Sequence, residues 1–161
     1  MQAEVRLYLG RAATIFIAAP LLAQASVGTP AAAIPAGADG AKIFSVTCAS
    51  CHLANGTGTE GKVPPLAGSE WVTGNEGRLV RIILHGLIGE VEVQGEMFSG
   101  AMPTWGGAFT DAQIASVASY VRGAWGNKAP PVHAASVAKI RESTAPRKVP
   151  WTAKELLRST P

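Results

Sequence analysis

The residues of this chain best suited to chemistry are two cysteines and a histidine in the run Cys48-Ala-Ser-Cys51-His52. The spacing C-x-x-C-H is typical of the covalent attachment site of a c-type haem. Two thiols about one helical turn apart can add to the two vinyl groups of one porphyrin. The histidine that follows can then place its imidazole on the iron. The run therefore predicts one covalently bound haem c, with His52 as the proximal iron ligand.

Other uses of paired cysteines fit the sequence less well. A dithiol redox motif is expected within a thioredoxin-like βαβ pattern, and none surrounds this run. A structural zinc site needs four ligands, whereas the chain has 2 cysteines and its other histidines, His85 and His133, are isolated. A disulfide would suit an exported protein, but it would leave His52 without a role.

A second signal downstream offers a ligand for the opposite face of the haem. Gly100-Ala-Met-Pro103 places a thioether in a Gly/Pro segment, where the following proline keeps Met102 extended. The rival Met97 lies in a predicted hairpin on the face of Glu92, which favours exposure. His85, the ligand that a bis-histidine haem would need, sits at the end of a predicted helix, where capping is the commoner use. The sequence thus predicts His52 and Met102 as axial ligands, a combination that suits electron transfer because it leaves no open iron position.

Both ends of the chain differ from its middle. Residues 1–25 combine a basic start, an apolar stretch and the run Ala23-Gln24-Ala25, the layout of a cleaved secretory signal peptide. The alternative, an uncleaved membrane anchor, would need about 20 apolar residues. We divide the remainder into a flexible Ala/Pro/Gly leader (26–36), a haem-binding domain (37–126) and a basic, Pro-containing tail (127–161).

Charge separates the domain from the tail. Residues 36–126 hold five Lys and Arg against eight Asp and Glu, a net charge of −3, whereas residues 127–161 hold seven against two, a net charge of +5. The tail is either a solvated extension or a segment that wraps the acidic domain or docks an acidic partner. The apolar residues that could anchor it are Val137, Ile140, Trp151, Leu156 and Leu157. Nucleic acid is excluded as a partner, because the basic part lacks a recognisable binding motif.

Hydrophobic spacing and capping signals predict a mainly helical domain. One helix should run from Asp39 through Val46 into the cysteine motif, and a second over 76–84. Pro64 and Pro65 impose an extended segment between them. Gln94 and Gly95 suggest the turn of a small hairpin. Thr110-Asp-Ala-Gln113 is a capping box that starts a last core helix, which Gly126 ends. Two short tail helices are expected over 134–142 and 152–158.

From Ala38 to Trp125 the chain resembles the class I, monohaem cytochrome c family. Gly40 and Phe44 match the glycine and aromatic residue of the family's first helix, and Val117 and Tyr120 match the apolar pair of its last helix. The resemblance implies an all-α fold class: the cytochrome c fold, with three to five helices around one covalent haem and a small β-hairpin before the Met ligand loop. The two helices should cross closely.

The resemblance also assigns two further haem contacts. In the family, a proline carbonyl about a dozen residues after the proximal histidine accepts a hydrogen bond from the imidazole, which fixes the ring and raises its basicity. Pro64 lies twelve residues after His52 and Pro65 thirteen; we choose Pro64 and keep Pro65 as the alternative. Leu66 should touch the haem face. The set of cofactor-binding residues is thus Cys48, Cys51, His52, Pro64, Leu66 and Met102, without catalytic residues.

The nearest resemblance is to bacterial periplasmic cytochromes c linked to dehydrogenases. It implies an electron carrier rather than an enzyme, exported to the periplasm. Its partners would be a redox protein donor and acceptor: a periplasmic dehydrogenase, and an oxidase or another cytochrome. It would meet a membrane only through a partner. One alternative is a dedicated subunit of a dehydrogenase with a quinone or molybdenum cofactor. The other is a haem peroxidase, which would need an open iron position.

Overall fold

The structure, a computed structural model, describes residues 39–159. The predicted signal peptide, the predicted leader and the start of the predicted domain lie outside these residues. No helix within residues 39–159 is long and apolar enough to cross a membrane. Helices α1 to α5 belong to the segment predicted as the cytochrome domain, and α6 and α7 to the tail.

The predicted first helix is divided into three parts. Helix α1 (Gly40–Ile43) is capped by Asp39, whose carboxylate accepts a bond from the N–H of Ala41. A π-helical turn over Phe44–Cys48 follows, and α2 (Ala49–His52) then completes the cysteine motif. The sequence did not predict the π turn.

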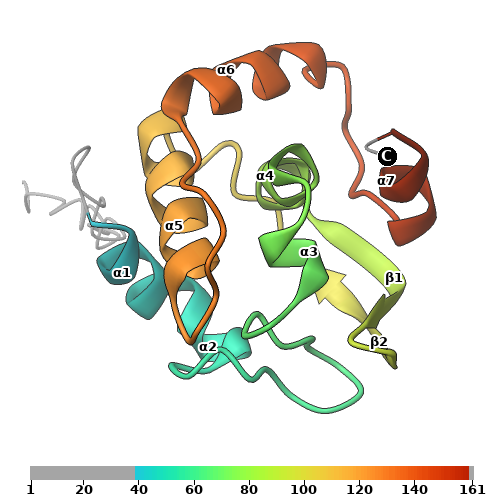
Figure 1. The fold of residues 1–161 in the computed structure, drawn as a ribbon. Coiled ribbons are helices and arrows are strands. Elements are labelled where there is room, and N and C mark those ends of the chain that lie inside the picture. Colours follow the sequence, from blue (N-terminus) through green and yellow to red (C-terminus); the bar gives the residue numbers. More distant parts are fainter. Residues whose placement is uncertain (1–38, 160–161) are drawn as a thin grey trace, which may run out of the picture. The chain divides into compact units, whose positions relative to one another are not determined.

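The last core helix, α5 (Asp111–Gly123), begins at the predicted capping box, with both reciprocal bonds between Thr110 and Gln113 in place. It crosses α1 closely, since a Cβ on Gly40 would lie 2.1 Å from the carbonyl oxygen of Ser116. The ring centroids of Phe44 and Tyr120 are 5.5 Å apart. The predicted contact between the first and last core helices is therefore confirmed. Figure 1 shows α1 beside α5.

The middle of the domain contains two helices and the hairpin. Helix α3 (Glu70–Thr73), which the sequence reasoning missed, is capped by Ser69, and α4 (Glu76–His85) by Asn75. Strands β1 (Leu87–Val93) and β2 (Glu96–Met102) pair antiparallel.

The hairpin keeps the expected register but is longer than expected. Val91 pairs with Phe98, and Glu92 pairs with Met97. Met102 is the last residue of β2, opposite Leu87. The prediction of a ligand loop after the hairpin was wrong in this respect, since the strand itself carries the methionine.

The tail is folded onto the domain. Helix α6 (Ala134–Ser143) packs against α4 and α5, and α7 (Ala153–Ser159) packs against β1. Val137 and Leu156 are fully buried, so they are anchors as expected, whereas Leu157 is 52% exposed and is not. A solvated extension is thus the wrong interpretation for residues 127–159.

Polar contacts also fasten the tail. The guanidinium of Arg141 bonds to the carboxylate of Asp111 at 2.7 Å and to two carbonyls beside it. The imidazole Nε2 of His85 lies 2.7 Å from Thr144 Oγ1. Trp151 forms a parallel bridge to Leu87, through its N–H to Gly86 and its carbonyl to Ile88.

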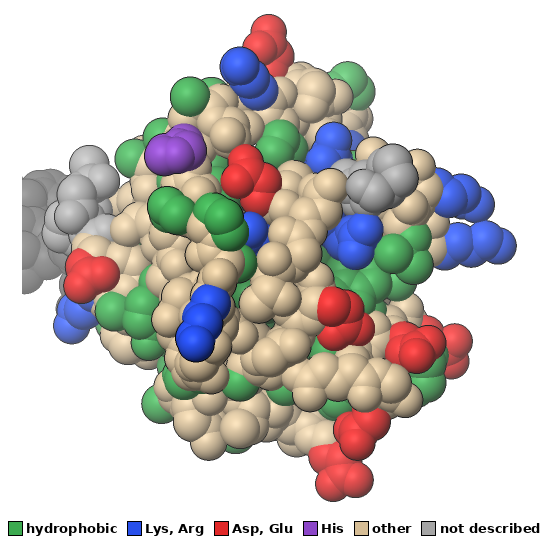
Figure 2. Space-filling view, viewed as in Figure 1, with side chains coloured by type: hydrophobic (Ala, Val, Ile, Leu, Met, Phe, Trp, Pro, Cys, Tyr) green, Lys and Arg blue, Asp and Glu red, His purple; other side chains and the backbone are tan. Residues whose placement is uncertain are grey.

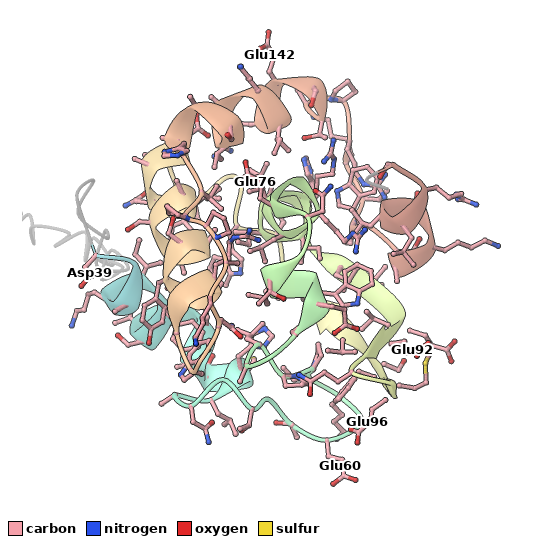
Figure 3. The ribbon with its side chains drawn as sticks, viewed as in Figure 1. Asp39, Glu60, Glu76, Glu92, Glu96 and Glu142 are labelled. Atoms are coloured by element: carbon pink, nitrogen blue, oxygen red, sulfur yellow. The ribbon has the colours of Figure 1, made fainter. Side chains whose placement is uncertain are left out.

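The expected separation of charge is visible on the surface. Glu60, Glu92 and Glu96 lie around the end of the hairpin (Figure 3). Basic side chains project from the side of the molecule that carries α7 (Figure 2). The two regions lie on one face of the molecule but do not overlap.

Candidate haem-binding site

An apolar cavity of about 580 Å³ lies inside the domain. It is enclosed by the cysteine motif, the segment 63–68 that contains Pro64 and Pro65 (the proline segment), α4, the hairpin and α5. Its volume is within the range of about 300–1,000 Å³ that is usual for ligand and cofactor sites. Its walls are mostly aliphatic and aromatic, including Phe44, Val72, Leu79, Ile82, Ile83, Val91, Val93, Phe109, Val117 and Val121. Such walls suit a large, flat, apolar ligand.

The π turn and α2 place the cysteine motif along one wall. Cys48, Cys51 and His52 all line the cavity, and neither cysteine forms a disulfide. Burial, with a smaller effect of nearby Cys51, raises the pKa of the Cys48 thiol to about 11. The helix ends directly after His52, because Leu53 has a φ of 61°. The predicted attachment residues are thus brought together along one wall of the cavity.

The imidazole of His52 is fixed by the proline segment. Its Nδ1 lies 3.3 Å from the carbonyl oxygen of Pro64, so Pro64 rather than Pro65 occupies the predicted position. Burial lowers the pKa of His52, against a smaller opposite effect of this hydrogen bond. The ring is therefore neutral near pH 7, donates from Nδ1, and keeps the Nε2 lone pair for a metal.

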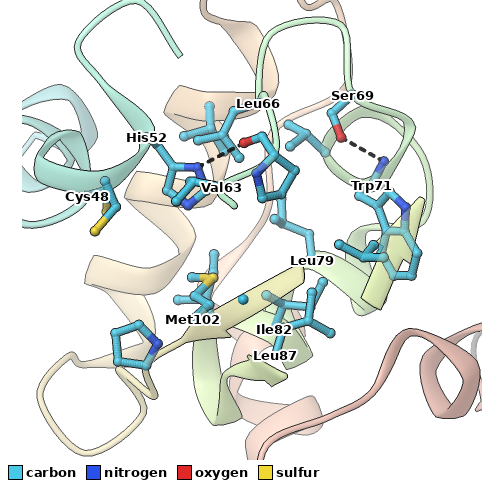
Figure 4. Close-up of a pocket in the computed structure, with 18 of the residues that line it drawn as sticks. Cys48, His52, Val63, Leu66, Ser69, Trp71, Leu79, Ile82, Leu87 and Met102 are labelled. Atoms are coloured by element: carbon cyan, nitrogen blue, oxygen red, sulfur yellow. Dashed lines mark hydrogen bonds between the residues drawn. The ribbon is translucent and has the colours of Figure 1, made fainter. Parts of the chain in front are cut away.

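Met102 stands on the opposite wall. Figure 4 shows its sulfur on the side that faces the His52 ring across the cavity. The chain after it is held to α4, because the hydroxyl of Thr104 donates to the carbonyl of Leu84 at 2.6 Å. A Cβ on Gly86 would lie 2.5 Å from the carbonyl oxygen of Met102. Close backbone packing thus fixes where the thioether sits.

The rival ligands lie elsewhere. Met97 is 57% exposed, and neither Met97 nor His85 lines the cavity. His133 precedes α6 in the tail and is exposed. Within residues 39–159, His52 and Met102 are therefore the imidazole and thioether that share the cavity.

Other side chains complete the walls. Leu66, Trp71 and Trp105 all line the cavity. The indole N–H of Trp71 donates to the carbonyl of Glu92 at 2.8 Å, so its hydrogen bond is made to the hairpin. Arg78 stacks 5.1 Å from the ring centre of Trp71. The sequence reasoning placed Leu66 at the haem but left both tryptophans without a settled role.

Sequence reasoning missed Asn127, which is buried just beyond α5. Its side chain bonds to Gly68, Leu66 and Val121. An asparagine after a helix stop carries no signal that would distinguish it from a turn residue. Only the fold brings it beside the proline segment.

The donor set and the cavity fit a c-type haem. Two thiols on one edge can form thioethers, an imidazole and a thioether face each other, and the walls between them are apolar. Among residues 39–159, no group of three or more His, Cys, Asp or Glu side chains is arranged to hold a metal ion directly.

Comparison with known proteins agrees with this fit. The family described as "Cytochrome C oxidase, cbb3-type, subunit III" matches residues 35–121. The chain is 42% identical over 94 residues to "Cytochrome c-552" of Thermus thermophilus, covering 56% of this chain and 70% of the relative. It is 41% identical over 110 residues to "Alcohol dehydrogenase (quinone), cytochrome c subunit" of Gluconacetobacter polyoxogenes, covering 66% of this chain and 23% of the relative.

A third relative is an oxidase subunit. The chain is 35% identical over 92 residues to a "Cbb3-type cytochrome c oxidase subunit" of Cereibacter sphaeroides, covering 56% of this chain and 28% of the relative. The chain therefore spans less than a third of the oxidase and alcohol dehydrogenase subunits that it matches.

Proposed function

Because this chain belongs to the cytochrome c family, it carries a covalently bound c-type haem and transfers electrons, and we propose that it does so as a periplasmic carrier whose iron ligands are His52 and Met102. The observation that carries the proposal is the cavity, with Cys48, Cys51 and His52 on one wall and Met102 on the other. Residues 1–25 would direct export and then be removed.

When bound, the haem supplies a one-electron ferrous/ferric couple. The chain's own residues would set how that couple behaves. The two thiols hold the macrocycle, the Pro64 carbonyl orients His52 and raises its basicity, and the apolar walls exclude water. Met102 would supply its thioether as the second iron ligand, which would favour electron transfer over binding of a substrate.

A peroxidase is not supported. It would need an open position and a polar pocket at the iron, whereas Met102 faces His52 across an apolar cavity.

The proposed partners are a dehydrogenase as donor and an oxidase or another cytochrome as acceptor.

A second candidate, a dedicated subunit of a dehydrogenase complex, is favoured by the identity to a quinone alcohol dehydrogenase subunit. It uses the same site. Copurification of the native protein with a dehydrogenase would favour it over a free carrier.

The ligand assignment is tested with paired methionine variants. Met102→Ala should keep the haem attached but lose the thioether absorption band of the ferric protein, lower the potential and allow small ligands to bind, because thioether ligation favours ferrous iron. The control Met97→Ala should change none of these. Loss of the band in Met97→Ala, or its retention in Met102→Ala, would contradict the assignment.

A further inference from the structure

Asn127 connects the end of the last core helix to the segment that holds the proximal histidine. It is 6% exposed and lies directly after Gly126, in a turn closed by its own N–H to the carbonyl of Ala124. We propose that Asn127 is a positioning residue for the proximal imidazole, acting through the backbone of Leu66–Gly68. The proposal rests on His52 being the iron ligand.

The side chain of Asn127 uses both ends of its amide. Its Oδ1 accepts from the N–H of Gly68 at 2.8 Å. Its Nδ2 donates to the carbonyl of Leu66 at 3.0 Å and to the carbonyl of Val121 at 2.7 Å. A single buried side chain therefore binds a donor and an acceptor of the proline segment to the last turn of α5.

This segment leads directly to the carbonyl that accepts from His52. The carbonyl oxygen of Pro64 lies 3.3 Å from His52 Nδ1. Because Pro64 stands two residues before Leu66, a shift of the 66–68 backbone would also move this oxygen. On the other side, Gly56 accepts from the N–H groups of Leu66 and Ala67 at 2.8 and 3.1 Å. The segment is thus held between Gly56 and Asn127.

Trp125, two residues before Asn127, holds the opposite arm of the same loop. Its indole N–H donates to the carbonyl of Ala54 at 3.1 Å. A Cβ on Gly56 would lie 2.6 Å from its ring. The turn 125–127 therefore contacts the loop between His52 and Gly68 at two places. Trp125 contacts the part of the loop near Ala54 and Gly56, and Asn127 contacts the proline segment.

Removing the side-chain amide of Asn127 should weaken the hydrogen bond from His52 to Pro64. That bond raises the basicity of the imidazole, and a more basic ligand favours ferric iron. Asn127→Ala should therefore raise the midpoint potential. One hydrogen bond weakened within a folded protein changes an equilibrium constant by about two- to tenfold, and tenfold corresponds to about 59 mV for a one-electron couple.

The experiment measures two properties of the haem-containing protein. Redox titration gives the potential, and proton NMR of the ferrous protein gives the shift and solvent exchange of the His52 Nδ1 proton. In Asn127→Ala we expect a higher potential together with faster exchange of this proton. Asn127→Gln keeps the amide on a longer stem, so it should shift both in the same direction by less, and it remains available if the alanine variant does not fold.

Arg122, in the last turn of α5, provides a matched control. It is 4% exposed and also makes three backbone bonds, to Val72, Gly74 and Pro130, but none to the proline segment. Arg122→Met should lower stability without changing the Nδ1 proton or the potential. An unchanged Nδ1 proton and potential in both Asn127 variants would overturn the proposal, and so would equal changes in Arg122→Met. Absence of a His/Met spectrum in the unmodified protein would instead refute the proposed function.

Discussion

Two neighbouring leucines of α7 test whether the tail is part of the folded protein. Leu156 is fully buried among Trp71, Ile82 and the apolar face of the hairpin, whereas Leu157 is 52% exposed. Replacing each with alanine removes the same atoms from the same helix. A difference in stability between the two variants therefore measures burial alone.

The size of the effect follows from the packing. A buried Leu→Ala change costs about 2–5 kcal/mol in free energy of unfolding. Because α7 is short and packs against β1, the loss is limited once the helix detaches, and we expect about 2–3 kcal/mol for Leu156→Ala. An exposed substitution such as Leu157→Ala should stay within about 0.5 kcal/mol.

Urea unfolding of the haem-containing protein measures both values, and limited proteolysis reports release of the tail. Leu156→Ala should unfold at lower urea and be cut earlier in residues 127–159. Equal midpoints and equal cleavage for the two variants would refute the packed tail and would restore the interpretation of a solvated extension.

Two further predictions concern the helix crossing and the tail contact. Gly40→Ala should destabilise the protein by about 3 kcal/mol or more, because its Cβ would meet the Ser116 carbonyl at 2.1 Å, whereas Gly123→Ala, with nothing within 4 Å, should be neutral or stabilising by thermal unfolding. The pKa of His85 is lowered by burial and by Arg147, Arg141, Lys148 and Arg81, so its contribution to stability is complete above its usual pKa near 6.5 and declines as pH falls below that value. Thermal midpoints at pH 7.5 and 5 should differ less in His85→Gln than in the unmodified protein, and a similar difference in both would contradict this role.

The sequence predicted the parts of the fold that depend on local signals. The capping box at Thr110, the apolar stripe of α4 and the Gln94-Gly95 turn each specify an element within a few residues. The hairpin register followed from that turn, and it correctly placed Met97 on the exposed face. The C-x-x-C-H run located one wall of the cavity because covalent attachment fixes its own spacing.

What the sequence left open depends on contacts between distant residues. The choice between Pro64 and Pro65 required the loop to be folded, since both carbonyls lie within reach of a ring at that separation. The tail remained ambiguous because its prolines argue against a compact domain, and only α4, α5 and β1 supply the surface on which it folds. Asn127 was missed because its three partners lie 6 to 61 residues away.

The π-helical turn over Phe44–Cys48 has a consequence for changes in chain length. An α-helix advances about 100° per residue, and the wider turn inserts one residue between the face of α1 that packs on α5 and the motif that follows. Deleting either exposed residue of the turn, Ser45 or Val46, would restore α-helical phase and rotate Cys48, Cys51 and His52 by about 100° relative to Gly40. Substitution at the same two positions leaves that phase unchanged. This segment is therefore expected to accept changes of side chain far more readily than insertions or deletions.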